Sequence, residues 1–195
     1  MTGWMIALAI LLLVMAGALV ACWRRGRAAK ATLENFLRED RERAARRRRV
    51  FDVLQGLGDA ILQNQSDPSL HRLMTEGAAR AVEAAGAVLY LVDEKHRVLV
   101  PRHSTRDCPP LIALPERIIS QAQVNAGTLA SFLRLHSIPA DEGVLGEVFS
   151  TQRPEKVDDL RHHPKFNGTT NPFQQHITAV VAPLLHGTRR LGVLA

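Results

Sequence analysis

The chain has 195 residues, of which 46% are hydrophobic and 23% charged; this composition suits a globular domain and excludes a disordered or collagen-like chain. Its formal net charge of +6 is concentrated between Arg24 and Arg49, where 11 Lys and Arg accompany 4 Asp and Glu, so that segment carries +7 and the rest of the chain −1. A basic segment next to an apolar run favours anionic lipid headgroups as its partner, and without interleaved aromatic residues it does not indicate nucleic-acid binding.

Residues 4–23 form an apolar segment without charge or proline, bounded by Trp4 and Trp23. As a helix the segment extends about 30 Å, which matches the hydrocarbon core, and tryptophans suit both interfaces. Basic residues follow the segment and none precedes it. We therefore expect a single-pass helix in the cytoplasmic (inner) membrane with the body in the cytoplasm. The string ending at Cys22 leaves one alternative open, a lipoprotein with an extracytoplasmic domain.

Residues 24–66 are rich in Ala, Leu, Glu and Arg and predict a charged helical linker. Apolar side chains recur in it at spacings typical of a coiled coil, although charged residues interrupt the same seam. The pattern favours a homodimer formed through the linker helix, and a solvated single helix stays open as the alternative. The apolar seam consists of Leu33, Phe36, Val50, Leu54, Leu57 and Ile61.

A second helix is predicted to follow, with Asp67 as its cap, Pro68 at its first position and Gly86 at its end. Its apolar face consists largely of Gly and Ala, so we expect the helix to lie flat on a sheet. The residues assigned to that face are Leu70, Leu73, Met74, Gly77, Ala78, Ala81, Val82 and Ala85.

Residues 87–93 (AVLYLVD) predict a central strand because they are apolar on both faces. A turn at residues 94–97 joins them to a second strand at 98–104, which makes a hairpin. Pro101 has no backbone N–H to donate, and it therefore restricts the second strand to a sheet edge or a bulge.

The remaining elements are shorter. Helical stretches are expected at 116–125 and 129–135, a Gly-led helix from Gly143, a short strand at 156–157, a surface loop at 158–175, and two strands at 177–185 and 189–195.

Five stretches in this order together resemble a GAF domain. They are the hairpin AVLYLVDEKHRVLV, the string Gly143-Val144-Leu145-Gly146-Glu147-Val148, its continuation to Pro154, the segment from Asp158 to Phe166, and the paired strands AVVAPLL and LGVLA. The resemblance covers Asp67 to Ala195 and implies an α+β fold, an antiparallel sheet flanked by helices, here preceded by the transmembrane helix and the linker. Similar domains continue beyond a strand like LGVLA, so the resemblance also implies a domain that is incomplete at its C-terminus.

GAF-like domains bind cyclic nucleotides, tetrapyrroles, haem or small metabolites between sheet and loops, or bind nothing and dimerise. The resemblance therefore implies a small-molecule pocket and leaves the cofactor unknown. Ordinary core packing and loop closure are the alternative roles for the residues placed there. The candidate pocket residues are Val144, Phe149, Asp158, Asp159, His163, Phe166 and Thr178.

Two other features are considered as chemical sites. His162 and His163 beside residues 158–159 are the best set of metal-type ligands, but adjacent histidines rarely face one ion, so no metal site is predicted. Cys108 before Pro109 resembles a haem-regulatory pair and its thiol suits bilin attachment. Its position departs from that of the expected chromophore cysteine, which favours an ordinary loop thiol.

The sequence lacks the groups that catalysis requires: a nucleophile with a base, a phosphate loop or a metal triad. We therefore expect a sensor rather than an enzyme. In this interpretation, ligand occupancy changes the packing of the linker helices and signals to a C-terminal effector, such as a serine/threonine phosphatase, a histidine kinase or a diguanylate cyclase. The alternative is a structural dimerisation domain without a ligand.

Overall fold

The computed structural model describes residues 40–166, 172–174 and 176–195. The chain divides into two compact units, Met1–Arg48 and Arg49–Ala195. The expected apolar span at 4–23 and the linker residues 24–39 lie outside the described residues, and a helix occupies residues 40–62. None of the helices in the described part of the chain is both long and apolar enough to cross a membrane.

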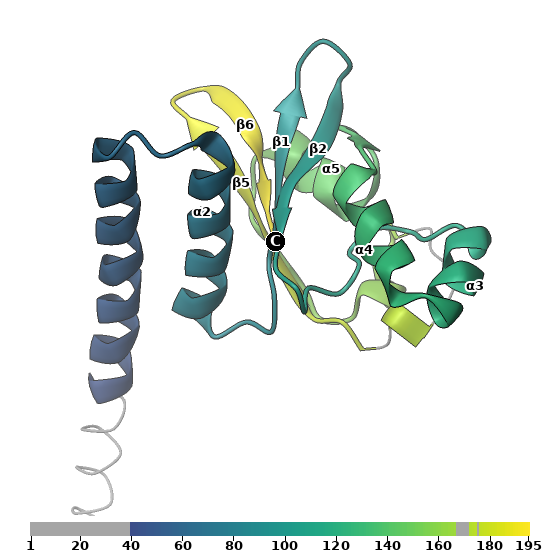
Figure 1. Cartoon of the computed structure of the whole chain (residues 1–195), viewed down its shortest axis with the longest axis horizontal. Helices are drawn as coiled ribbons and strands as arrows, with labels where there is room; N and C mark the ends of the chain where they lie inside the picture. Colours follow the sequence, from purple (N-terminus) through teal and green to yellow (C-terminus); the bar gives the residue numbers. More distant parts are fainter. Residues whose placement is uncertain (1–39, 167–171, 175) are drawn as a thin grey trace, which may run out of the picture. The chain divides into compact units, whose positions relative to one another are not determined.

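The second unit is built on one six-stranded sheet with the order β3-β2-β1-β6-β5-β4 (Figure 1). Every neighbouring pair of strands is antiparallel, which with the flanking helices gives the predicted α+β fold. The strands are β1 Val88–Asp93, β2 Val98–Ser104, β3 Ile138–Pro139, β4 Glu155–Val157, β5 Ala179–His186 and β6 Arg189–Leu194.

The predicted hairpin is confirmed as β1 and β2. Leu89 pairs with His103, and the register then shifts so that Tyr90 pairs with Pro101. Arg102 is therefore the extra residue of a β-bulge. Pro101 lies directly beside the bulge, where the ladder is already interrupted, as its missing N–H requires.

Strand β1 is covered on both faces. Tyr90 belongs to the main hydrophobic core, whereas Leu89 is fully buried but points to the opposite face because neighbouring side chains alternate along a strand. Gly192 of β6 lies opposite Leu91, and a Cβ there would collide with the carbonyl oxygen of Tyr90. The close approach of β6 to β1 therefore requires glycine at this position.

Helix α2 comprises Asp67–Val82, and its start is close to the predicted one. Ser66, not Asp67, occupies the N-cap position, and neither residue makes a side-chain capping bond. The helix ends four residues before Gly86 because Glu83 adopts a left-handed conformation, with φ of 57°.

The single apolar face predicted for α2 is right only in part: Gly77 and Ala81 are buried, and the helix packs on β2 as expected. Val82 is 71% exposed, although it was assigned to that face. The helix is instead covered on two sides, by strands β1 and β2 and by the helix at residues 49–62, where Val53 contacts Gly77. Because α2 is buried on two sides, its buried surface is wider than the single apolar stripe of an ordinary surface helix. The buried residues are Thr75, Gly77, Ala79 and Ala81.

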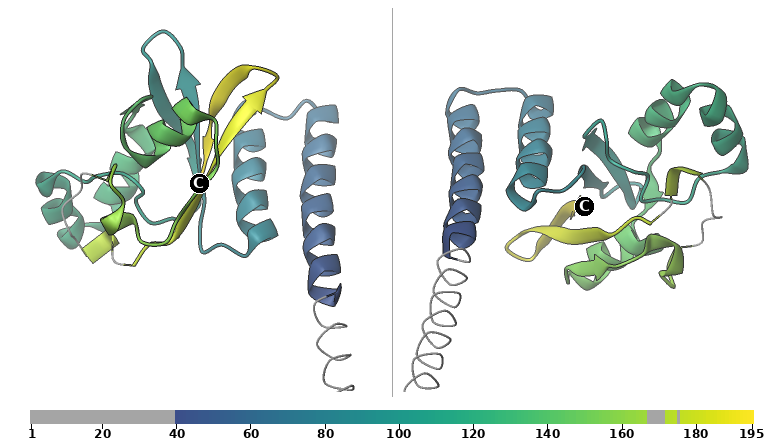
Figure 2. Two further views of the ribbon diagram at one scale, coloured as in Figure 1. Left: turned by 180° about the vertical axis from the view of Figure 1, so that it is seen from behind. Right: turned by 90° about the horizontal axis from the view of Figure 1, so that it is seen from below.

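The opposite face of the sheet carries α5, which comprises Gly143–Thr151 as predicted and contacts β5 and β6 (Figure 2). The predicted helical stretches before it form α3, Glu116–Val124, and α4, Ala126–Leu135, which pack on each other. Helix α4 also contacts β2. The main core lies between α5 and the sheet; it includes Tyr90, Leu99, Leu145, Val148, Val181 and Val193.

The segment predicted as a surface loop at 158–175 is only partly one. It contains two 3-10 turns, η1 at Leu160–His162 and η2 at Pro172–Gln174. Leu160 and Gln174 are almost fully buried. The prediction was wrong here because polar composition alone does not show that a loop folds back under the sheet.

Candidate functional site

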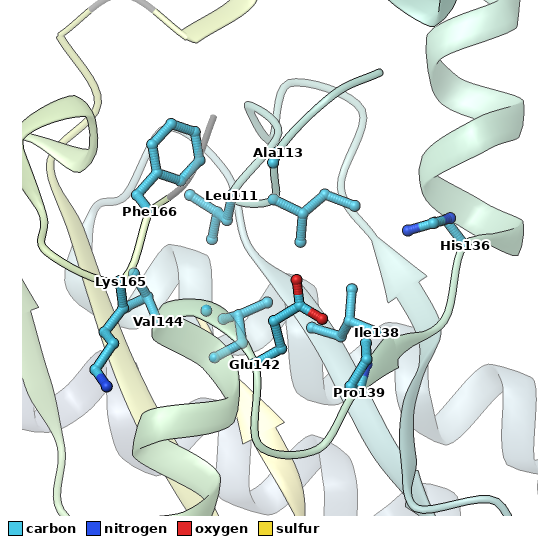
Figure 3. A pocket seen from close by; sticks show the side chains of 12 residues that line it. Leu111, Ala113, His136, Ile138, Pro139, Glu142, Val144, Lys165 and Phe166 are labelled. Carbon is cyan, nitrogen blue, oxygen red and sulfur yellow. The ribbon is translucent and has the colours of Figure 1, made fainter. Parts of the chain in front are cut away.

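A cavity of about 120 Å³ lies where the N-terminus of α5 meets β3 and two loops (Figure 3). The first loop supplies residues 111–113, and the second supplies Lys165 and Phe166. Most of the wall is apolar and inaccessible to solvent, which is typical of small-molecule sites. The apolar lining consists of Leu111, Ile112, Ala113, Ile138, Pro139, Val144, Leu145 and Phe166.

Three polar side chains border this cavity: Glu142, His136 and Lys165. The Glu142 carboxylate points into the space between Leu111 and Ile138, whereas the Lys165 ammonium points away from it (Figure 3). Glu142 occupies the N-cap position of α5 but its side chain makes no capping bond. The mouth of the cavity is therefore polar and its floor apolar.

His136 is the residue directly after α4, and two contacts with Phe132 hold it in place. The two rings stack with centroids 4.5 Å apart and an interplanar angle of 24°. The backbone N–H of His136 also donates to the carbonyl oxygen of Phe132 at 2.8 Å. These contacts fix the imidazole at the side of the cavity.

A buried amide fixes the loop that forms one wall. The Nε2 group of Gln174 donates hydrogen bonds to the carbonyl oxygens of Pro110 at 3.0 Å and Ile112 at 2.6 Å. These bonds satisfy two backbone acceptors that have no strand partner. Gln174 therefore positions Leu111 and Ile112, although it does not line the cavity.

Two of the seven residues expected at the pocket, Val144 and Phe166, line this cavity. Phe149 lies about one and a half turns further along α5. It is buried in the core beneath the guanidinium of Arg190, whose Cζ is 5.8 Å from the ring centroid. The arrangement is a cation–π contact at the far end of the helix. Phe149 therefore contributes to a different region from Val144.

Three further candidates, Asp158, Asp159 and Thr178, take part in local structure outside the cavity. Asp158 pairs with Lys156 at 2.6 Å, and its carbonyl oxygen accepts a 2.9 Å bond from the Thr178 hydroxyl. The carboxylate of Asp159 caps η1 and accepts two bonds from the Arg161 guanidinium, at 3.1 and 2.6 Å. This bidentate pairing holds the pKa of the Asp159 carboxyl well below its usual range.

The last candidate, His163, is separated from His162. His162 contacts Asp159 at 3.1 Å, whereas the Nε2 atom of His163 contacts Glu155 at 2.8 Å. Ligand atoms of Glu147, Glu155 and His163 all lie within 4.8 Å of one another, so metal-type ligands come together in this group rather than in the set considered around His162.

The hydrogen bonds of His163 indicate a structural role for the group formed by Glu147, Glu155 and His163. The backbone N–H of Lys165 donates to its Nδ1 atom at 3.2 Å, so Nδ1 accepts and the Nε2 proton is directed at Glu155. A metal bound at Nε2 would displace that proton and its bond to Glu155. The observed geometry is thus that of a hydrogen bond joining β4 to the loop after η1.

Cys108 is half-buried in the loop that leads from β2 to the cavity. Burial raises the pKa of its thiol to about 11. Burial, together with the neighbouring thiol of Cys108, also raises the pKa of the Tyr90 phenol. Because the thiolate is the reactive form of cysteine, this environment favours an inert loop thiol.

Most residues that line the cavity could not be assigned to a pocket from the sequence. Leu111 and Ile112 lie in a Pro-containing loop without periodicity, and Ile138 belongs to a two-residue strand. Glu142 had a weak signal, since it immediately precedes the Gly-led helix whose first residues were assigned to the pocket. No sequence pattern marks His136, which follows an ordinary amphipathic helix.

A family model described as GAF domain matches residues 67–195. A comparison with curated proteins returns no match. Similar solved structures include the GAF domains of phosphoenolpyruvate-protein phosphotransferases from Coxiella burnetii (15% identity, 74% of each chain covered, TM-score 0.50) and Acinetobacter (18%, 74% of this chain and 73% of that one, 0.49). A third is the free methionine-R-sulfoxide reductase of Neisseria meningitidis in complex with its substrate (18%, 74% and 70%, 0.48).

At these identities the likeness to solved structures concerns the fold alone. The family match, in contrast, spans the whole segment that contains α2, the six-stranded sheet and the cavity. This chain belongs to the GAF domain family.

Proposed function

We propose that this chain is the sensor part of a membrane-anchored regulatory protein, and that it binds a small molecule in the cavity between α5 and β3. The observation that supports this function most is the cavity itself: an apolar floor and a polar mouth in a domain of a family with regulatory and sensory roles. The role is regulatory rather than catalytic.

In this proposal, residues 4–23 anchor the chain as a single membrane-spanning helix with the GAF domain in the cytoplasm. The support comes from the sequence: an uncharged apolar segment of the right length, followed by basic residues. A membrane-impermeant thiol reagent applied to intact cells distinguishes this topology from a lipoprotein. The exposed position Ser120 is the better place for a reporter cysteine, because the Cys108 thiol is half-buried.

We further propose that two copies of the chain pair through the helix at residues 40–62. Val50, Leu54, Leu57 and Ile61 follow one another at spacings of four, three and four residues, which is the spacing of a coiled-coil seam. Val50, Leu54 and Ile61 are 43%, 61% and 56% exposed, so most of this seam is not covered within one chain. A second copy of the same helix would bury it.

Pairing through the helix at residues 40–62 predicts that the apparent mass of the protein rises with its concentration. In light scattering, the full chain in detergent is expected to be dimeric and the Leu54→Glu variant to be monomeric. Val124→Glu is the matched control, because Val124 is 91% exposed on α3 and away from the seam. A Leu54→Glu variant that remains dimeric would contradict the pairing.

In this proposal, signalling connects the ligand cavity to the paired helices at residues 40–62. Ligand in the cavity stabilises one arrangement of the domain, and the helix pair passes that preference to an effector such as a serine/threonine phosphatase, a histidine kinase or a diguanylate cyclase. A dimerisation domain without a ligand is the second candidate, and the exposed seam is the observation that favours it.

Ligand binding discriminates these two functions. The full chain is screened against a library of metabolites, and the melting temperature is recorded with and without each compound. Ala113 lies exposed at the mouth of the cavity, so Ala113→Trp is expected to obstruct entry without disturbing the core. Ala84→Trp, at an exposed turn after α2, is the control. A compound that stabilises wild type and Ala84→Trp, but not Ala113→Trp, supports the sensor; a library without any such compound supports the dimerisation domain.

A further inference from the structure

The dimensions of the cavity restrict its ligand. An engineered cavity of about 150 Å³ lined by Leu, Ile and Phe accommodates one benzene molecule. The cavity beside α5, at about 120 Å³, has a similar lining and slightly less room. A body of at most the size of one six-membered ring therefore fits below the mouth, whereas a tetrapyrrole or a cyclic nucleotide is several times larger.

The floor of the cavity restricts the chemistry of that body. Leu111, Ile112, Ile138 and Leu145 are all at most 8% exposed and present no polar side-chain atom. A polar group placed against them would lose its water without gaining a hydrogen bond, which opposes binding. The part of the ligand that enters the floor is therefore a hydrocarbon or an aromatic ring.

The charge at the mouth restricts the other end of the ligand. The carboxylate of Glu142 points into the cavity (Figure 3), and no described residue forms a hydrogen bond or an ion pair with it. Lys165, the only Lys or Arg among the described residues that line the cavity, directs its ammonium away from the cavity (Figure 3). The N-terminus of α5 favours negative charge at this place, which stabilises the carboxylate where it stands.

We propose that the cavity binds a small organic cation: an ammonium or amidinium group paired with Glu142, and an apolar body no larger than a phenyl ring in the floor. This assignment rests on the proposed function, which makes the cavity a ligand site, and adds the class of ligand. Glu142 is the residue that sets the preference for charge, and Ile138 and Val144 contact the apolar body.

Three probes of the same shape test the assignment: benzylamine, benzyl alcohol and benzoate. At neutral pH they carry a positive charge, no charge and a negative charge. Binding to the full chain is measured by titration, following the methyl NMR signals of Ile138 and Val144. Benzylamine is expected to bind most tightly and benzoate least, since the carboxylate attracts the first and repels the last. The preference for benzylamine is expected to weaken as salt is added.

Glu142→Gln keeps the shape of the side chain and removes its charge. It is expected to weaken benzylamine binding roughly fivefold or more and to leave benzyl alcohol unchanged, because only the charged pair is lost. Asp141→Asn removes the same charge from the neighbouring residue, which does not line the cavity, and is expected to preserve the benzylamine affinity.

The outcomes separate this assignment from the proposed function. If benzyl alcohol or benzoate binds as tightly as benzylamine, or if Glu142→Gln leaves benzylamine affinity unchanged, the class of ligand is wrong while the cavity remains a binding site. If none of the three probes binds, the assignment is overturned as well. The sensor function itself is then decided by the metabolite screen on wild type, Ala113→Trp and Ala84→Trp.

Discussion

The side-chain amide of Gln174 donates a 2.6 Å hydrogen bond to the carbonyl oxygen of Ile112, 62 residues earlier in the chain. The same nitrogen donates to Pro110, so one buried side chain holds the loop that forms a wall of the cavity. The geometry of the candidate site therefore depends on a residue outside it.

Gln174→Leu leaves both carbonyl oxygens without this donor. It is expected to lower the free energy of unfolding by about 1–3 kcal/mol, which urea denaturation measures. Gln121→Leu, at an exposed position of α3, is expected to change it by less than about 0.5 kcal/mol. Equal effects of the two substitutions would show that the buried amide does not support the loop.

Two helical glycines are expected to respond in opposite directions to alanine. A Cβ at Gly77 would lie 2.5 Å from Cγ1 of Val53, so Gly77→Ala is expected to destabilise the fold by about 1–3 kcal/mol despite the better helix propensity of alanine. A Cβ at Gly56 would meet no neighbouring atom within 4 Å, so Gly56→Ala is expected to stabilise the fold by about 0.5–1 kcal/mol.

Thermal or urea unfolding of the two variants measures this difference. If Gly77→Ala is as stable as Gly56→Ala, then α2 does not pack closely on the helix at residues 49–62. The pair thus tests the packing that buries a second side of α2.

The ion pair of Asp159 with Arg161 is expected to make stability depend on pH in the acid range. The folded-state pKa of Asp159 is lowered from an ordinary value of 3.8, so its contribution is complete above that pH and is lost as the pH falls below it toward the folded pKa. Between pH 4 and pH 2, wild type is therefore expected to lose more stability than Asp159→Asn.

Melting temperatures of both proteins from pH 6 to pH 2 measure this effect, with Asp107→Asn as a control for removing an exposed carboxylate from a different loop. The difference between wild type and Asp159→Asn is expected to shrink as the medium becomes more acidic. A difference that stays constant across the range would mean that the charge of Asp159 contributes nothing.

The thiol of Cys108 is expected to react slowly. Its pKa of about 11, against an ordinary 9.0, lowers the thiolate fraction at pH 8 roughly 100-fold. Alkylation by iodoacetamide, followed by peptide mass spectrometry, compares Cys108 with a reference cysteine introduced at the exposed Ser120. Comparable rates at the two positions would contradict the buried, inert thiol and would reopen covalent attachment of a ligand there.

Elements with a regular pattern could be predicted from the sequence. The strand containing Tyr90 is apolar on both faces and ends at a polar turn. The composition of this stretch therefore predicted both its central position in the sheet and its hairpin with the next strand. The helix that begins at Gly143 was found from its motif, and with it Val144. Strand β3 has only two residues, Ile138 and Pro139, which is too short for any alternation to appear.

The candidate site was predicted only where it coincides with such elements. Val144 is the second residue of α5, Phe166 ends one of the stretches that resemble the family, and both line the cavity. Leu111 and Ile112 come from a loop whose path is set by Gln174, far along the chain. Long-range contacts of this kind leave no local pattern, which is why the wall of the cavity and the charge of Glu142 emerged only from the structure.

The position of a bound ligand shows most directly whether the cavity beside α5 is the binding site. The compound that raises the melting temperature most in the metabolite screen is added to the full chain with labelled Ile, Leu and Val methyl groups, and the NMR shifts are mapped. If the cavity beside α5 binds the ligand, the largest changes are expected at Leu111, Ile138 and Val144. Changes confined to Ile118 and Leu135, which line a separate groove between α3 and α4, would contradict it.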